Sequence, residues 1–249
     1  MRALYNNLFD SPETIDSLSE ATNYPIENAQ NVSLDKVWRS TGLASETVTI
    51  DAGAGETFTM DSFAIVGHNL TSGATIDFQM NATDAWGAPS VDESVTWRAG
   101  IIVHYFTSAS YRFARIVISD AANTDGYIEV ARFFEGAYLQ FDPSSTIEFK
   151  IDNIRNDIQI FSDANVAWTR EGVSWRTFEY KFPRTAYTMV AKLRTMWDTV
   201  GLHKPIIFMN YDDRFTEIDP AYCLIMNNFS ESWKAGQKVE YDLRLRETR

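Results

Sequence analysis

The densest group of reactive side chains is a run of carboxylates in "NYDDRFTEIDP", which holds Asp212, Asp213, Glu217 and Asp219. Closely spaced carboxylates could bind a cation or exchange protons in acid–base catalysis. Arg214 lies within the same run and offsets part of its charge, and the run separates two segments that have the composition of strands. We therefore predict a solvated turn here, with no metal and no catalytic role.

The other reactive side chains are scattered. His68, His104 and His203 occur in both halves of the chain without the spacing of metal ligands, so structural roles are predicted for them. Cys223 is the one cysteine, which excludes an intrachain disulfide and a zinc site built on paired cysteines. The sequence also lacks a phosphate loop, a Gly-x-Ser-x-Gly motif and a dinucleotide fingerprint. We expect no enzymatic activity, no cofactor and no bound metal.

Trp86, in the loop-like stretch "DAWGAPS", is the strongest candidate for contact with a ligand. A tryptophan at the rim of a loop can stack its flat face on a sugar ring. The same residue can instead plug the end of a β-sandwich core, and the sequence favours neither alternative. Trp86 is therefore a candidate glycan contact.

The two halves of the chain differ in charge. The 249 residues carry a net charge of −12, and 45% of them are hydrophobic. Residues 1–140 hold 7 basic and 18 acidic side chains, whereas residues 141–249 hold 15 and 16. This shift predicts two domains, 1–140 and 141–249. The acidic first half disfavours binding to nucleic acid, because phosphates would meet carboxylates.

No apolar run approaches the roughly 18 residues of a membrane span, so no membrane insertion is expected. The N-terminal stretch "MRALYNNLFDSPET" lacks the continuous apolar segment of a signal peptide. We therefore expect the chain to fold in a cytoplasm.

Short strands and turns account for most of residues 1–140. The stretch "GATIDFQMNA", for example, places Ile76, Phe78 and Met80 on one face of a strand. No helical segment of useful length interrupts this pattern, which is typical of a β-sandwich or jelly roll.

The irregular stretch "NYPIENAQNVSLDKVWRSTG" follows neither a helical nor a strand period. We predict that it forms an ordered loop, anchored by Trp38 in the core. Side-chain hydrogen bonds from Asn28, Asn31 and Asp35 to the backbone would fold it on itself.

The second half combines strands with one helix, an α+β pattern. Pro183 is predicted to end a strand, Thr185 to cap the helix that follows and Gly201 to terminate it. The helix carries one apolar stripe, formed by Ala186, Met189, Val190, Leu193, Met196, Trp197 and Val200. We assign Trp197 a structural role.

The last segment, "QKVEYDLRLRET", alternates strictly between apolar and charged residues. Val239, Tyr241, Leu243 and Leu245 share one face. A strand this long would be prone to aggregation if its edge were exposed in a monomer, so we predict that it pairs with a neighbouring subunit.

The first half resembles the discoidin or galactose-binding-like jelly roll in "NAQNVSLDKVWRS", "VTIDAG", "FAIVGHNL" and "YIEVARFFEG". The resemblance spans roughly residues 11–138 and lies in pattern rather than identity. It implies a β-sandwich whose loops at one end bind glycans in many relatives and are structural in others.

The second half resembles the tail-tube-like domain of bacteriophage distal tail and minor tail proteins. The resemblance rests on the order of "WRTFEYKFP", the helix "RTAYTMVAKLRTMWDTVG", "HKPIIFMNYDD" and "AYCLIMNNFSESWKAGQKVEYDLRLRET". It implies a subunit that closes into a ring, expected to be a hexamer, between tail tube, tape-measure and hub or baseplate proteins. The jelly roll would be peripheral.

Two functions are consistent with these patterns. The first is a structural virion protein of a phage tail tip, assembled in the host cytoplasm. The alternative is a glycan-binding adhesin that contacts host surface polysaccharide through its jelly roll, with Trp86 as the contact.

Overall fold

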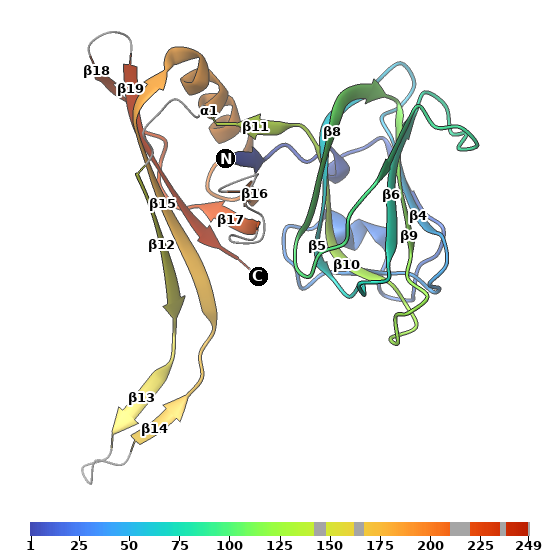
Figure 1. The fold of residues 1–249 in the computed structure, drawn as a ribbon, viewed down its shortest axis with the longest axis horizontal. Helices are drawn as coiled ribbons and strands as arrows, with labels where there is room; N and C mark the ends of the chain where they lie inside the picture. Colours follow the sequence, from blue (N-terminus) through green and yellow to red (C-terminus); the bar gives the residue numbers. More distant parts are fainter. Residues whose placement is uncertain (142–147, 162–166, 210–219, 235–237, 249) are drawn as a thin grey trace. The chain divides into compact units, whose positions relative to one another are not determined.

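A computed structural model describes residues 1–141, 148–161, 167–209, 220–234 and 238–248. The protein is mainly β, as the sequence predicted, with one α-helix among the described residues (Figure 1). The chain divides into two compact units. Unit 1 comprises Met1–Gln140 and Ile207–Ala221, and unit 2 comprises Phe141–Ile206 and Tyr222–Thr248. The second domain was predicted to span residues 141–249 without a break. Unit 2 is instead interrupted by Ile207–Ala221, which belongs to unit 1.

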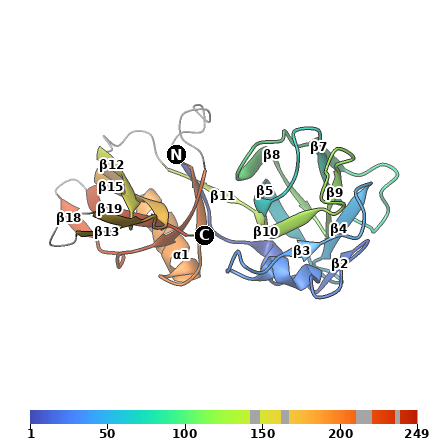
Figure 2. The same cartoon turned by 90° about the horizontal axis from the view of Figure 1, so that it is seen from below.

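Most of unit 1 is a jelly roll of two antiparallel sheets that face each other as layers (Figures 1 and 2). The first sheet has the order β2 (Thr14–Ser17), β4 (Glu46–Asp51), β9 (Phe113–Ser119), β6 (Thr75–Asn81) and β7 (Val91–Ser94). The second has the order β3 (Trp38–Arg39), β10 (Glu129–Gly136), β5 (Phe58–His68) and β8 (Ile102–Tyr111).

Strand alternation builds the core between the two sheets. In β6, the side chains of Ile76, Phe78 and Met80 are buried and those between them are more exposed. The same alternation in β4 and β9 buries Val48 and Ile116 from the neighbouring strands. In these three strands apolar side chains at every second position reach one layer, so the period-2 pattern determines which face turns inward.

The irregular stretch near the N-terminus is an ordered loop that contains a short 3-10 helix, η2 (Ile26–Gln30). Asn28 Nδ2 donates to the carbonyl of Val37 at 2.9 Å, and Asn31 Oδ1 accepts the N–H of Ser33 at 2.9 Å. Asp35, for which a bond to the backbone was predicted, instead lies 3.5 Å from the Ser33 hydroxyl. A second 3-10 turn, η1 (Leu8–Asp10), precedes β2.

The jelly roll is an insertion between two strands that pair with each other. β1 (Arg2–Leu4) pairs on one side with β11 (Tyr138–Gln140) and on the other with β16 (Ile206–Met209). Arg2 stacks on Tyr138 with its guanidinium carbon 4.5 Å from the ring centre. The chain thus leaves this small ribbon after β1, builds the jelly roll and returns to it at β11.

Unit 2 is an antiparallel sheet with a helix. Its strands are β17 (Ala221–Ile225), β19 (Lys238–Glu247), β15 (Ser174–Ala186) and β12 (Glu148–Arg155), in that order, with β18 (Ser232–Lys234) also on β19. β12 and β15 lead into a separate two-stranded hairpin, β13 (Ile158–Phe161) with β14 (Ala167–Arg170). This hairpin extends beyond the rest of unit 2 (Figure 1).

The helix α1 (Tyr187–Val200) begins later than the sequence predicted. Its N-cap is Ala186, whereas Thr185, the predicted cap, is a buried residue of β15 paired with Val239. Pro183 does not end β15 either, because the strand continues past a register shift between Phe182 and Thr185. No helix in the described ranges is long and apolar enough to cross a membrane.

Candidate functional site

Trp86 lies in the connection between β6 and β7, on a support of polar side chains. Its ring stacks on Arg115, with the guanidinium carbon 4.3 Å from the ring centre, and its indole N–H donates to Asp84 at 2.6 Å. Arg115 in turn donates to Gln79 Oε1 at 3.0 Å through Nε, and Gln79 donates to Asp92 at 2.8 Å. The indole is thereby held in one orientation and is half-buried.

This arrangement could bind a neutral ligand with a flat apolar face. Arg115 covers part of one face of the Trp86 ring. A sugar would therefore have to stack on a part of the indole that Arg115 does not cover. Asp84 and Asp92 supply hydrogen-bond acceptors nearby. Burial lowers the pKa of the Arg115 guanidinium, but a guanidinium remains charged in proteins, so the support of the ring is independent of pH.

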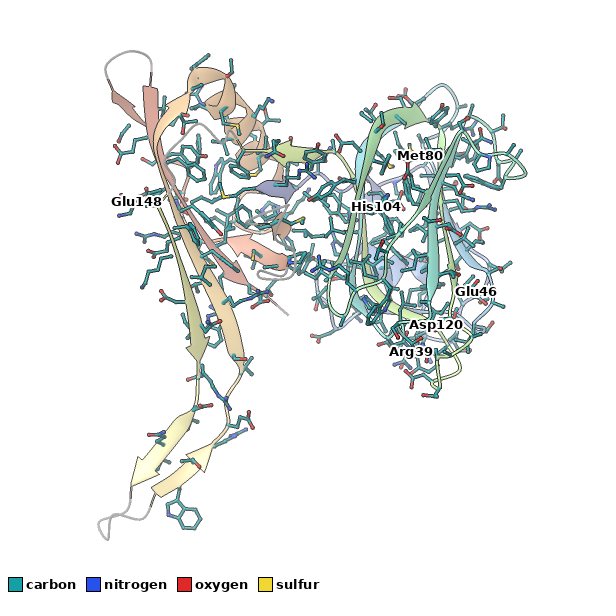
Figure 3. The ribbon with its side chains drawn as sticks, viewed as in Figure 1. Arg39, Glu46, Met80, His104, Asp120 and Glu148 are labelled. Atoms are coloured by element: carbon teal, nitrogen blue, oxygen red, sulfur yellow. The ribbon has the colours of Figure 1, made fainter. Side chains whose placement is uncertain are left out.

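The other end of the jelly roll is closed by a cation–aromatic cluster. Arg39 lies between Tyr24 and Tyr127, with its guanidinium carbon 3.9 and 4.7 Å from their ring centres, and forms an ion pair with Glu129. This hydrogen bond to Glu129 raises the pKa of Arg39. Figure 3 shows Arg39 and Asp120 at the same end of the jelly roll and Met80, which leads into the Trp86 loop, toward the other.

The three histidines have different partners. His68 Nδ1 accepts the N–H of Leu70 at 3.1 Å, and desolvation lowers the pKa of His68. His104 lies 3.3 Å from a carboxylate oxygen of Glu93 and stacks on Phe106. His203 follows α1, where its N–H donates to Val200. Among the residues that the structure describes, no three His, Cys, Asp or Glu side chains gather as metal ligands.

Cys223 lies in surroundings that suppress the reactivity of its thiol. Cys223 is a buried free thiol, and burial raises its pKa far above the usual value. A thiol in such surroundings is protonated and poorly reactive. The predicted carboxylate turn, Asp212 to Asp219, lies outside the described residues.

The predicted inter-subunit strand is not an open edge, which corrects the sequence prediction. β19 pairs with β15 on one side and with β17 and β18 on the other. Its four apolar residues are at most 5% exposed and belong to the core: Val239, Tyr241, Leu243 and Leu245. A strand at the centre of a sheet and a strand at its edge can both bury one face and expose the other. The alternating pattern of β19 therefore could not show whether it is an edge strand.

β12 lies at one end of its sheet in the described part of the chain. Within the described part of the chain it pairs with β15 alone, from Glu148 opposite Lys181 to Arg155 opposite Ser174. Phe149 and Ile154 of this strand are 42% and 37% exposed. On its other side, β12 faces no strand of the described residues.

Trp197 is half-buried and lines an apolar cleft between α1 and the sheet, together with Leu193, Met196 and Phe229. A polar cavity of about 240 Å³ lies next to it and shares Asn227 and Tyr241 with the cleft. Burial raises the pKa of the Tyr241 hydroxyl, which keeps it neutral. The position of Trp197 is that of a packing residue on the inner face of the helix.

Comparison with known proteins gives no sequence family: no family model matches the chain, and no curated protein matches it. Solved structures resemble about half of it. A chitosan-binding module from a chitosanase/glucanase of Paenibacillus sp. IK-5 is 19% identical, with a TM-score of 0.40, over 53% of this chain and 98% of that one. The family 32 carbohydrate-binding module of C. perfringens NanJ, in complex with galactose, is 12% identical, with a TM-score of 0.42, over 56% and 100%.

A Streptococcus pneumoniae fucose-binding module is 10% identical, with a TM-score of 0.42, over 53% of this chain and 95% of that one. The jelly-roll description of unit 1 rests on its own strand order rather than on these scores. The resemblance of the second half to tail proteins rests on the sequence alone.

Sequence reasoning missed that the hairpin β13–β14 of unit 2 exposes large apolar side chains. Ile158, Ile160 and Trp168, in the hairpin β13–β14, are 47%, 61% and 69% exposed. The stretch "IQIF" was recognisable as a strand. What the sequence does not reveal is that, among the described strands, this one pairs with β14 alone.

Proposed function

We propose that this chain is a structural subunit that assembles with copies of itself into a closed ring at the tip of a bacteriophage tail. Unit 2 builds the ring, and the jelly roll is carried on it as a peripheral module. The subunit would be assembled in the host cytoplasm and then reside in the virion. The assignment to a tail rests on the element order of the second half, and the ring on the surface of unit 2.

The observation that supports assembly best is the position of β12 at the end of its sheet among the described strands. Eight residues of backbone pair with β15 and with no other described strand, and two large apolar side chains of this strand are exposed. Monomeric proteins usually cover such an edge, because it readily pairs with another chain. A strand added by a neighbour at β12 would be a heterologous contact, which closes into a ring if the rotation allows.

Charge favours contact through the same unit. Residues 141–249 are nearly neutral, whereas residues 1–140 carry most of the net charge of −12. Copies that meet through unit 2 therefore avoid opposing one jelly roll with another. Repulsion between the acidic halves should still weaken assembly at low ionic strength, where the Debye length is long.

Sedimentation velocity at increasing protein concentration tests this proposal. We expect a single large species to grow with concentration, and its fraction to rise when salt is raised from about 10 mM to 150 mM, which shortens the Debye length from about 30 to 8 Å. A monomer at every concentration and at both salt levels would contradict it.

A second candidate function is glycan binding by unit 1, and the geometry of Trp86 favours it. The half-buried indole is held by Arg115 and Asp84, so little conformational freedom would be lost on stacking against a sugar. The two functions are compatible. A ring would present several jelly rolls together, which would give it a higher avidity for a glycan-covered surface than one jelly roll alone.

Glycan binding predicts that Trp86→Ala lowers affinity for host surface polysaccharide by tenfold or more, which corresponds to about 1.4 kcal/mol of lost stacking. Trp86→Phe is the matched control, because it keeps an aromatic face and should retain much of the binding. The measurement is a glycan array followed by titration with any glycan that binds. Unchanged binding by Trp86→Ala would exclude this residue as the contact.

A further inference from the structure

Contacts join five side chains around the indole into what we call the Trp86 network: Asp84, Trp86, Arg115, Gln79 and Asp92. Its members come from the loop before β7 and from β6, β9 and β7, which are neighbouring strands of one sheet. The network contains two carboxylates and one guanidinium, so it is negative overall. Its charges are also placed unequally with respect to a ligand.

The guanidinium of Arg115 is engaged by protein groups. Its Nε and Nη2 atoms both donate to Gln79 Oε1, at 3.0 and 2.5 Å, and its carbon lies 4.3 Å from the centre of the Trp86 ring. Nε and Nη2 form an edge with which a guanidinium clamps a carboxylate through two parallel hydrogen bonds. The cation three residues earlier, Arg112, donates two hydrogen bonds to Asp51 at 2.6 and 2.7 Å. A sugar carboxylate would therefore have to displace a protein acceptor to be clamped by either edge.

The carboxylates of the network face solvent instead. Asp84 and Asp92 are exposed, whereas Arg115 is half-buried. Burial lowers the pKa of Arg115, and the charges of Asp84 and Asp92 oppose that shift, so both carboxylates lie close to the guanidinium. A ligand that stacks on the indole thus meets two exposed negative charges, while the positive charge lies against the ring.

Further negative charge surrounds the network. Asp77 precedes Gln79 by two positions in β6, so the two side chains lie on the same face of the sheet. The hydrogen bond that Asp77 accepts from Ser94 Oγ, at 2.9 Å, comes from a neutral donor. Residues 1–140 hold 7 basic and 18 acidic side chains. An anionic ligand would therefore approach this site against the field of the whole domain.

We propose that the Trp86 site takes an uncharged glycan and discriminates against acidic glycans, those that contain sialic or uronic acids, through Asp84 and Asp92. The inference rests on glycan binding by unit 1, the second candidate function, and adds the class of glycan. An uncharged sugar can stack on the indole and donate its hydroxyls to the two carboxylates, which accept but cannot donate. A sugar carboxylate would be desolvated beside like charges without gaining a partner.

A glycan array that carries each neutral glycan beside its sialylated and uronic-acid forms tests this choice with the full chain. Titration calorimetry of the pair that binds best then gives the ratio of the two affinities. We expect the neutral form to bind about tenfold more tightly or better at about 10 mM salt, and the ratio to shrink at about 150 mM, where the Debye length falls to about 8 Å.

A double variant, Asp84→Asn with Asp92→Asn, removes both charges and keeps an acceptor oxygen for the indole N–H and for Gln79. Because both positions are exposed, it should fold. We expect it to bind the acidic form more tightly than the wild type does and to narrow the ratio to about threefold or less. Glu27→Gln with Asp35→Asn is the matched control, since it removes two charges from exposed positions of the N-terminal loop and should leave the ratio unchanged.

Each outcome distinguishes the inference from the function on which it rests. If the wild type binds acidic glycans as tightly as neutral ones, the inference is wrong although glycan binding stands. An unchanged ratio in the Asp84 and Asp92 double variant, or equal narrowing in the control, would also overturn it, because these carboxylates would then not set the choice. A chain that binds no glycan would overturn glycan binding by unit 1 and the inference with it.

Discussion

Replacing Trp38 with alanine is expected to lower the free energy of unfolding of the jelly roll by about 3–5 kcal/mol, the usual cost of removing a fully buried large aromatic side chain. Trp38 is 0% exposed and packs on Phe133, with ring centres 6.0 Å apart. Its indole N–H donates to the carbonyl of Ser19 at 3.3 Å. It also belongs to β3, which pairs with β10, so the cavity would open where the N-terminal loop meets the sheet.

A domain of ordinary stability, about 5–15 kcal/mol, would lose a large part of it through this change. Chemical denaturation followed by circular dichroism measures the effect. Trp86→Ala is the matched control, since the same atoms are removed from a half-exposed loop position, and it should cost less than about 1 kcal/mol. Equal stability of wild type and Trp38→Ala would show that the N-terminal loop does not depend on its anchor.

The second large effect concerns Glu135, a fully buried carboxyl group in β10. It is 1% exposed, Phe63 lies opposite it on β5, and its Oε2 has no hydrogen-bond partner among the described residues. Burial raises the pKa of Glu135 to about 8, so the group is largely protonated at neutral pH in the folded protein. In the unfolded chain it ionises near its usual value of about 4.3.

The raised pKa makes stability fall with pH. Between about pH 4.5 and 8 the folded state holds a proton that the unfolded state has released, so the free energy of unfolding decreases by up to about 1.4 kcal/mol per pH unit. Below that window the contribution is fully present, and above it the penalty is complete. Glu135→Gln cannot ionise, so the free energy of unfolding of this variant should not decrease with pH in this way. Relative to the wild type, the variant should become more stable by several kcal/mol as pH rises from 5 to 9. Parallel stability curves for the two proteins would contradict a protonated Glu135.

Much of unit 1 follows from the sequence because its signals are local. Ile76, Phe78 and Met80 alternate within one strand, and all three are buried. The loop before β3 was predicted to be ordered from its side-chain chemistry, and two of its three predicted polar residues form the expected bonds. The local pattern of apolar residues is sufficient to predict which side chains are buried when a strand turns one face to a single core.

The errors lie where a partner is distant in sequence. Nothing in the short β1 indicates that it pairs with β11 and β16, more than a hundred residues away. Thr185 has the composition of a helix cap, but tertiary pairing with Val239 extends β15 through it. The strand β19 alternates as an exposed edge strand would, yet its neighbours in space cover both sides. The pattern of one strand cannot specify which strands flank it.

The Trp86 site illustrates the same limit. The sequence left open whether this tryptophan plugs the core or lies on a rim. The structure places it on Arg115, a residue of β9 that is distant in sequence, and leaves the indole half-buried. No spacing rule links the two positions, because the contact depends on the pairing of β6 with β9.

Electron microscopy of the purified chain, at a concentration where sedimentation shows the large species, tests the central claim most directly. We predict closed rings of one size with cyclic symmetry, in which unit 2 forms the continuous ring and the jelly rolls are peripheral. Single subunits only, or open chains without closure, would contradict the assignment of this protein as a ring-forming structural subunit.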